Sequence, residues 1–143
     1  MNILEEFKSK IIGAYLDSFG VKKQFLELEL SSKDYELICV HIDCSFTSSD
    51  IKLNTISNSL KNWDIDVYNI TIFIGMNRGR IIDCYFDDKN NFVLKIHSGY
   101  KVIFNLSNQV DYASSLSFSF KEKLSTSEYT YFDIMPNGTI IKQ

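Results

Sequence analysis

Residues 1–143 are predicted to fold as a single α+β domain. The expected architecture is one mostly antiparallel sheet of about six to eight strands, with an N-terminal helix and one or two further helices packed on it. Three observations predict this class. Apolar residues recur at helical spacing near the amino terminus, most of the remaining chain alternates apolar and polar residues, and turns containing glycine, asparagine or serine separate the alternating segments.

The first element is a predicted helix at residues 2–18. Ile3, Phe7 and Ile11 lie four residues apart, so they share one face of a helix. Asn2 is a suitable N-cap, because its side-chain oxygen can accept a hydrogen bond from a backbone N–H of the first turn. The sequence therefore predicts an amphipathic helix that packs its apolar face on the sheet.

The next two elements are predicted strands that form a hairpin. Leucine alternates with glutamate at 26–30, and isoleucine and valine alternate with cysteine and histidine at 35–43. Residues 45–63 follow and fit two descriptions. Asp50 can cap a short helix there, but the many serine, threonine and asparagine residues weaken that helix, and a loop with one or two helical turns fits nearly as well.

Residues 67–106 alternate most clearly and predict a four-stranded antiparallel meander. Its strands are expected at 68–74, 82–86, 92–96 and 102–106. Residues 109–124 fit both a helix and a strand. The helix is favoured, because Lys121 and Lys123 would lie near its carboxyl end and Asp111 can cap its start.

The chain ends in a predicted hairpin, in which the segment 136–139 (PNGT) joins strands at 129–134 and 139–141. The strands also carry apolar residues on the face opposite their main apolar stripe. We expect a helix of the same domain to cover that face, and a partner protein is the alternative. The apolar residues on this second face are Tyr35, Leu37, Phe73, Ile81, Tyr85, Val93 and Ile103.

Charge and composition exclude several classes of protein. Fifteen Lys and Arg against 18 Asp and Glu give a net charge of −3, and only Arg78 and Arg80 are arginines, so a nucleic-acid partner is not expected. The first ten residues do not resemble a secretory signal, and no apolar run is long enough to span a membrane. Three cysteines without a secretory segment indicate a reducing compartment, so we expect a cytoplasmic protein.

One short segment could carry chemistry. Cys39, His41 and Asp43 would share a strand face, and Cys44 follows directly. A zinc site would need paired ligand motifs, which are missing, so neither a metal nor another cofactor is expected. Cys44 with His41 as a base could instead form a small hydrolase-like site, and this enzyme remains an alternative to a protein without catalytic activity.

The favoured hypothesis is a protein-binding module. The chain is small, acidic and rich in aromatic residues, with eight Tyr, eleven Phe and one Trp, and tyrosine and tryptophan are suited to anchor interfaces. In size, charge, composition and α+β layout it resembles small bacterial immunity proteins, which neutralise cognate toxins. The resemblance implies a partner that is a basic toxin domain, whose active site the chain would occlude.

Contacts with that partner are expected in the acidic amino-terminal half, where residues 1–72 hold seven Lys and Arg and eleven Asp and Glu. Each of the acidic residues could equally be an ordinary part of a solvated surface. A structural or phage accessory protein that pairs with a second copy through its last strand is a further alternative. The predicted partner-binding residues are Glu27, Glu29, Tyr35, Glu36, Asp64 and Asp66.

Overall fold

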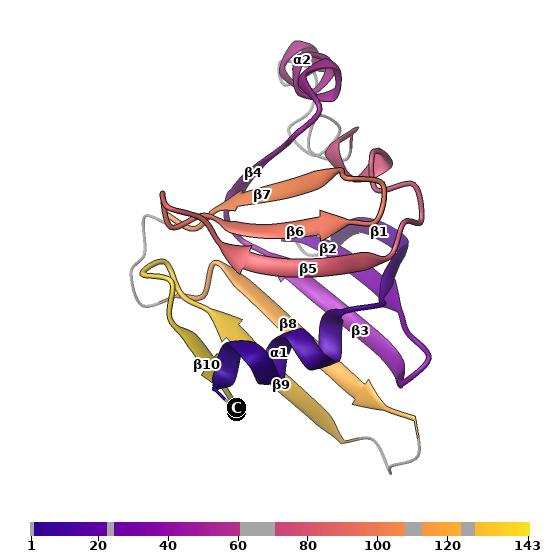
Figure 1. Cartoon of the computed structure of the whole chain (residues 1–143), viewed down its shortest axis with the longest axis vertical. Coiled ribbons are helices and arrows are strands. Elements are labelled where there is room, and N and C mark those ends of the chain that lie inside the picture. Colours follow the sequence, from indigo (N-terminus) through magenta and orange to yellow (C-terminus); the bar gives the residue numbers. More distant parts are fainter. Residues whose placement is uncertain (1, 23–24, 61–70, 108–112, 124–127) are drawn as a thin grey trace.

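The computed structural model describes residues 2–22, 25–60, 71–107, 113–123 and 128–143, and these residues form ten strands in two antiparallel sheets (Figure 1). The six-stranded sheet has the order β1 (Tyr15–Lys22), β2 (Phe25–Ser31), β3 (Tyr35–Ile42), β8 (Leu116–Glu122), β9 (Tyr129–Ile134) and β10 (Ile140–Lys142). The four-stranded sheet has the order β4 (Ser45–Ser48), β7 (Lys101–Asn105), β6 (Phe92–Ile96) and β5 (Ile81–Phe86). Helices α1 (Ile3–Ile11) and α2 (Ile51–Leu60) complete the main elements.

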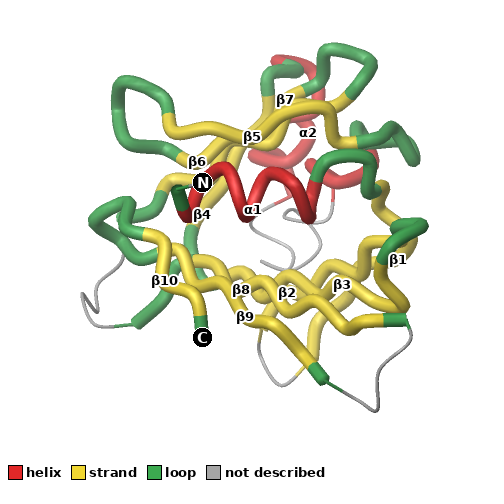
Figure 2. The backbone as a smooth tube through the Cα atoms, turned by 60° about the horizontal axis from the view of Figure 1, so that its bottom comes forward, coloured by secondary structure: helices red, strands yellow, loops and turns green. Residues whose placement is uncertain are grey.

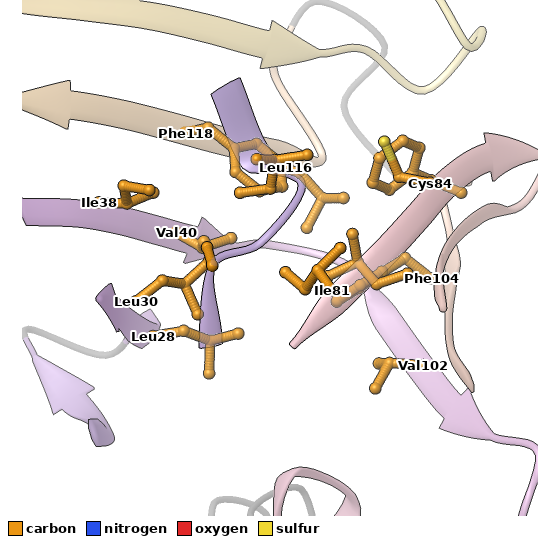
Figure 3. Close-up of a cluster of buried hydrophobic side chains, with 14 of the residues drawn as sticks. Leu28, Leu30, Ile38, Val40, Ile81, Cys84, Val102, Phe104, Leu116 and Phe118 are labelled. Atoms are coloured by element: carbon orange, nitrogen blue, oxygen red, sulfur yellow. The ribbon is translucent and has the colours of Figure 1, made fainter. Parts of the chain in front are cut away.

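The predicted α+β class, with a predominantly antiparallel sheet and an N-terminal helix, is confirmed. The strands divide between two sheets rather than one, and the apolar faces of both sheets meet in a single core. Figure 3 shows Leu28 and Val40 of the six-stranded sheet near Ile81 and Phe104 of the four-stranded sheet. No helix among the described residues has the length and apolar character needed to cross a membrane.

Helix α1 lies between the two sheets at one end of the core (Figure 2). Asn2 is its N-cap, as predicted, because the Oδ1 atom of Asn2 accepts a hydrogen bond of 2.9 Å from the backbone N–H of Glu5. The prediction that the helix extends to residue 18 is wrong. The helix ends at Ile11, because Ile12 already has an extended backbone with ψ of 132°. Gly13, with a φ of +92°, then turns the chain, and Tyr15 begins β1.

Two further expectations for secondary structure are wrong. Residues 71–74 of the strand predicted at 68–74 are helical, while 68–70 lie outside the described residues. The helix favoured over 109–124 is instead strand β8 in its described part. β8 pairs with β3 and β9, and its alternate side chains Leu116, Phe118 and Phe120 are fully buried. Pairing on both edges and burial of one face outweigh the charges that favoured a helix.

The segment 45–63 holds both a strand and a helix. β4 pairs with β7, and α2 begins after Asp50, whose Oδ1 atom accepts hydrogen bonds from the backbone N–H groups of Lys52 and Leu53 at 2.8 and 3.2 Å. The helical alternative is therefore confirmed over its described residues 51–60, with the predicted cap. Helix α2 follows β4 after a connection of two residues, Ser49 and Asp50. Figure 1 shows α2 beyond the end of β4.

The second apolar face of the predicted sheet is not a separate surface. Tyr35 and Ile81 both belong to the common core. The strand pairing shifts register directly after each of them, between Tyr35 and Leu37 and between Ile81 and Asp83, so simple alternation does not give their side. Phe73 is also buried there, from the helical turn at 71–74. Val93 is also buried, although it is not part of the common core. The other three residues of the predicted second face are only half-buried. These three are Leu37, Tyr85 and Ile103.

Candidate functional site

Cys44 and His41, which the alternative hydrolase-like site would combine, lie in different surroundings. His41 is exposed on β3, while Cys44 is half-buried and packs against the hydrophobic core. Burial, assisted by the neighbouring Asp43 carboxylate, raises the pKa of the Cys44 thiol to about 12. A thiol that stays protonated at neutral pH is a poor nucleophile. His41 lies instead near Glu27, with 3.9 Å between its Nδ1 atom and the Glu27 Oε2 atom.

The structure separates the predicted partner-binding residues. Glu27 and Glu29 are half-buried on β2, and Glu36 is exposed on β3, with its Oε2 atom 3.5 Å from the Nζ atom of Lys121. Tyr35 is buried and therefore does not offer its ring to a partner. Asp64 and Asp66 lie outside the described residues.

Tyr35 has a structural role in the core. Its ring packs edge-on against Phe120, with 5.2 Å between the ring centroids, and its hydroxyl oxygen accepts a hydrogen bond of 3.0 Å from the Nζ atom of Lys10. The same ammonium group lies 5.4 Å from the Tyr35 ring centroid. Tyr35 thus links α1 to β3, and its polar end is satisfied within the fold.

The two glutamates on β2 belong to a larger surface, which we call the outer face. It is the side of the six-stranded sheet that points away from the four-stranded sheet. Figure 2 shows α1 and the four-stranded sheet on the other side, and no helix of the described residues covers the outer face. The outer face comprises Glu27, Glu29, Leu37, Cys39, His41, Ser117, Ser119, Lys121, Tyr129, Tyr131 and Asp133.

The most exposed aromatic residues of the outer face are Tyr129 and Tyr131 on β9. Their rings are stacked, with centroids 6.0 Å apart and planes inclined by 23°, and the two residues are 40% and 44% exposed. Ile141 on the neighbouring strand β10 is 42% exposed and is paired with Asp133. Two large, rigid rings and an apolar side chain therefore meet solvent at the same end of the sheet.

Asp133 places a fixed carboxylate beside the tyrosines. Its Oδ1 atom accepts a hydrogen bond of 2.8 Å from the Ser117 hydroxyl, and its Oδ2 atom accepts one of 2.7 Å from the Nε2 atom of Gln143. These hydrogen bonds hold the carboxylate in one orientation without neutralising it. The carboxyl-terminal part of the outer face thus combines aromatic surface with an oriented negative charge.

Sequence reasoning missed this part of the outer face. The segment 129–134 was predicted as a strand, and its alternation already places Tyr129, Tyr131 and Asp133 on the face opposite Phe132 and Ile134. That alternation was the available signal. The expected contacts were instead placed in the amino-terminal half, because the excess of acidic residues lies there.

The described residues also line two sizeable surface clefts. One, of about 500 Å³, lies between the α1–β1 connection, the β2–β3 turn and Arg80. The other, of about 660 Å³, lies at the start of α2 and includes Tyr100. Burial raises the pKa of Tyr100, whose hydroxyl donates a hydrogen bond to the carbonyl of Ile72. The described part of the chain contains no group of three or more His, Cys, Asp or Glu residues that could hold a metal ion.

Comparison with known proteins does not assign a function to any of these surfaces. No protein-family model, curated protein or solved structure matches the chain. The outer face and the two clefts are the surfaces of the described residues whose geometry and chemistry suit binding.

Proposed function

We propose that the chain is a non-enzymatic protein-binding module of the immunity type, which binds a basic toxin domain in the bacterial cytoplasm and occludes its active site. The observation that carries this proposal is the exposed, stacked pair of Tyr129 and Tyr131 on the outer face. Tyrosine is enriched among the residues that dominate binding energy, because a rigid ring buries a large area at a small cost in conformational entropy.

Charge on the same face supports a basic partner. Glu27, Glu29 and Asp133 place carboxylates on β2 and β9, while the carboxylate of Glu36 on β3 is offset by Lys121. The whole chain has a net charge of −3. A partner with lysine or arginine around its active site would therefore meet both aromatic anchors and opposite charge on one surface.

The first experiment is capture of the partner from a lysate of the native cells, followed by a functional test of what is captured. We expect one basic protein that inhibits growth when it is produced alone, and normal growth when this chain is produced with it. Capture without toxicity, or toxicity that this chain does not relieve, contradicts the proposal. A stable homodimer with no other partner would favour the structural homo-oligomer instead.

The surface is tested with Tyr129→Ala/Tyr131→Ala. We expect this double variant to weaken binding of the captured toxin by at least about 100-fold, since truncation of a dominant interface residue commonly costs 2 kcal/mol or more. Tyr85→Ala is the matched control, because Tyr85 is a half-buried tyrosine of the four-stranded sheet. Equal affinities of the wild type and the folded double variant, measured by calorimetry, would remove the outer-face tyrosines from the interface.

A further inference from the structure

The cleft beside Arg80 is separate from the outer face and is suited to a ligand of its own. Its volume of about 500 Å³ is in the range of small-molecule sites. Three segments that are distant in sequence line it: the α1–β1 connection with Ile12 and Gly13, the β2–β3 turn with Ser32 and Lys33, and the residue before β5, Arg80. The cleft is therefore lined by apolar and aromatic side chains on one segment and by hydroxyl and cationic side chains on the others.

Arg80 is held in place within this cleft. Its Nη1 atom donates a hydrogen bond of 2.7 Å to the carbonyl of Gly13, and its Cζ atom lies 5.2 Å from the ring centroid of Tyr15. The backbone on both sides is also anchored. The Arg80 carbonyl accepts from the N–H of His97 at 2.9 Å, and the N–H of Ile81 donates to the carbonyl of Ala14 at 2.8 Å. The guanidinium therefore has a fixed orientation, and most of its donors remain for a ligand.

The charges of the cleft leave an excess of cationic groups. Arg80 and Lys33 both line it, together with one carboxylate, that of Asp34. Within the described part of the chain, neither cation forms an ion pair, with Asp34 or with any other acidic group. The Ser32 hydroxyl accepts a hydrogen bond from the N–H of Asp34 at 3.2 Å, so its own proton can still be donated.

We propose that this cleft binds a small organic phosphate. The fork of the Arg80 guanidinium matches two phosphate oxygens, and the Lys33 ammonium and the Ser32 hydroxyl supply further donors. Phosphate alone would leave much of the volume unfilled. The ring of Tyr15 and the side chain of Ile12, which is 45% exposed, provide an apolar wall for the organic part of the ligand.

The test is a titration of the isotopically labelled protein, followed by NMR, with inorganic phosphate, phenyl phosphate and sodium chloride at equal ionic strength. We expect saturable shifts of the amide signals of Gly13, Ser32 and Lys33 with both phosphates. Phenyl phosphate should bind several-fold more tightly than inorganic phosphate, because it also contacts the apolar wall. Chloride should produce no saturable shift. Equal affinity for the two phosphates would overturn the organic part of the proposal.

Variants distinguish this site from general attraction of anions. Arg80→Gln should weaken phenyl phosphate at least tenfold, and Arg78→Gln, which removes the other arginine and does not line the cleft, should leave its affinity unchanged. Lys33→Gln lies in an exposed turn and should weaken binding several-fold, so it decides the question if Arg80→Gln does not fold. Unchanged affinity in Lys33→Gln, or equal losses in the Arg80 and Arg78 variants, would refute the site. None of these measurements needs the proposed toxin partner.

Discussion

Cys44 and Cys84 are both packed among apolar side chains, and burial raises the pKa of each thiol to about 12. An unfolded cysteine has a pKa of about 8.5. Between these two values the folded protein retains thiol protons that the unfolded chain has lost. The contribution of the thiols to the free energy of unfolding therefore decreases as the pH rises above about 8.5, by at most about 1.4 kcal/mol per pH unit for each thiol.

We predict that Cys44→Ala/Cys84→Ala lowers stability at pH 7.5 but reduces its dependence on pH between 8.5 and 10.5. Urea unfolding of the wild type and the variant across this range measures both effects. The two proteins differ only at these two positions, so the difference between the curves reports the thiols. Parallel curves would show that the thiols ionise equally in the folded and unfolded states.

At the scale of single elements, the stability of α1 depends more on the packing of Phe7 than on the helix propensity of its residues. A helix of nine residues is unstable in isolation. Phe7 is fully buried and meets four rings edge-on, with centroid distances between 4.8 and 6.2 Å. These rings come from both sheets: Phe92, Phe118, Phe120 and Phe132.

We predict that Phe7→Ala lowers the free energy of unfolding by about 3–5 kcal/mol, because it leaves a cavity where the helix and both sheets meet. Ile51→Ala in α2 is the control, since Ile51 is 80% exposed, and it should change stability by about 0.5 kcal/mol or less. Chemical unfolding of the two variants provides the comparison. A loss below about 1 kcal/mol for Phe7→Ala would mean that α1 is not essential to the core.

The sizes of local and tertiary contributions to stability explain which elements could be predicted from the sequence. The Asn2 cap and the hairpins β2–β3, β5–β6, β6–β7 and β9–β10 have local causes and agree with the prediction. The helix favoured at 109–124 rested on charges worth about 0.3–1 kcal/mol each. Burial of Leu116, Phe118 and Phe120 in β8 is worth about 1.5–3 kcal/mol for each side chain. That larger contribution depends on the core and on pairing with β3, which is distant in sequence from β8. The local pattern fits both structures and therefore could not decide between them.

At the scale of the whole molecule, the division into two sheets determines which surfaces are exposed. β3 pairs with β8, which is more than 70 residues further along the chain, and this pairing builds the outer face from both halves of the sequence. The acidic residues of β2 could be proposed from composition alone. Their place on the same face as Tyr129 and Tyr131 requires the strand order, which alternation does not specify.

The charge of the molecule as a whole leads to a last prediction, about the rate of association with the proposed partner. Long-range attraction between the acidic chain and a basic toxin accelerates encounter, and salt screens it, since the Debye length falls from about 10 Å at 0.1 M to about 3 Å at 1 M. The stacked tyrosines act only at contact. Added salt should therefore lower the association rate constant about tenfold or more and change the dissociation rate constant much less.

Stopped-flow or surface-based kinetics at several salt concentrations tests this for the wild type, Glu29→Gln and Asp88→Asn. Each variant removes one negative charge, but Glu29 is on the outer face and Asp88 is exposed in the β5–β6 turn. In Glu29→Gln the side-chain oxygen can still accept the hydrogen bond from the Ser18 hydroxyl. Glu29→Gln should therefore reduce the salt dependence of association more than Asp88→Asn does. Association that is indifferent to salt would refute electrostatic steering, while the affinity lost on removal of Tyr129 and Tyr131 would still test the aromatic contact separately.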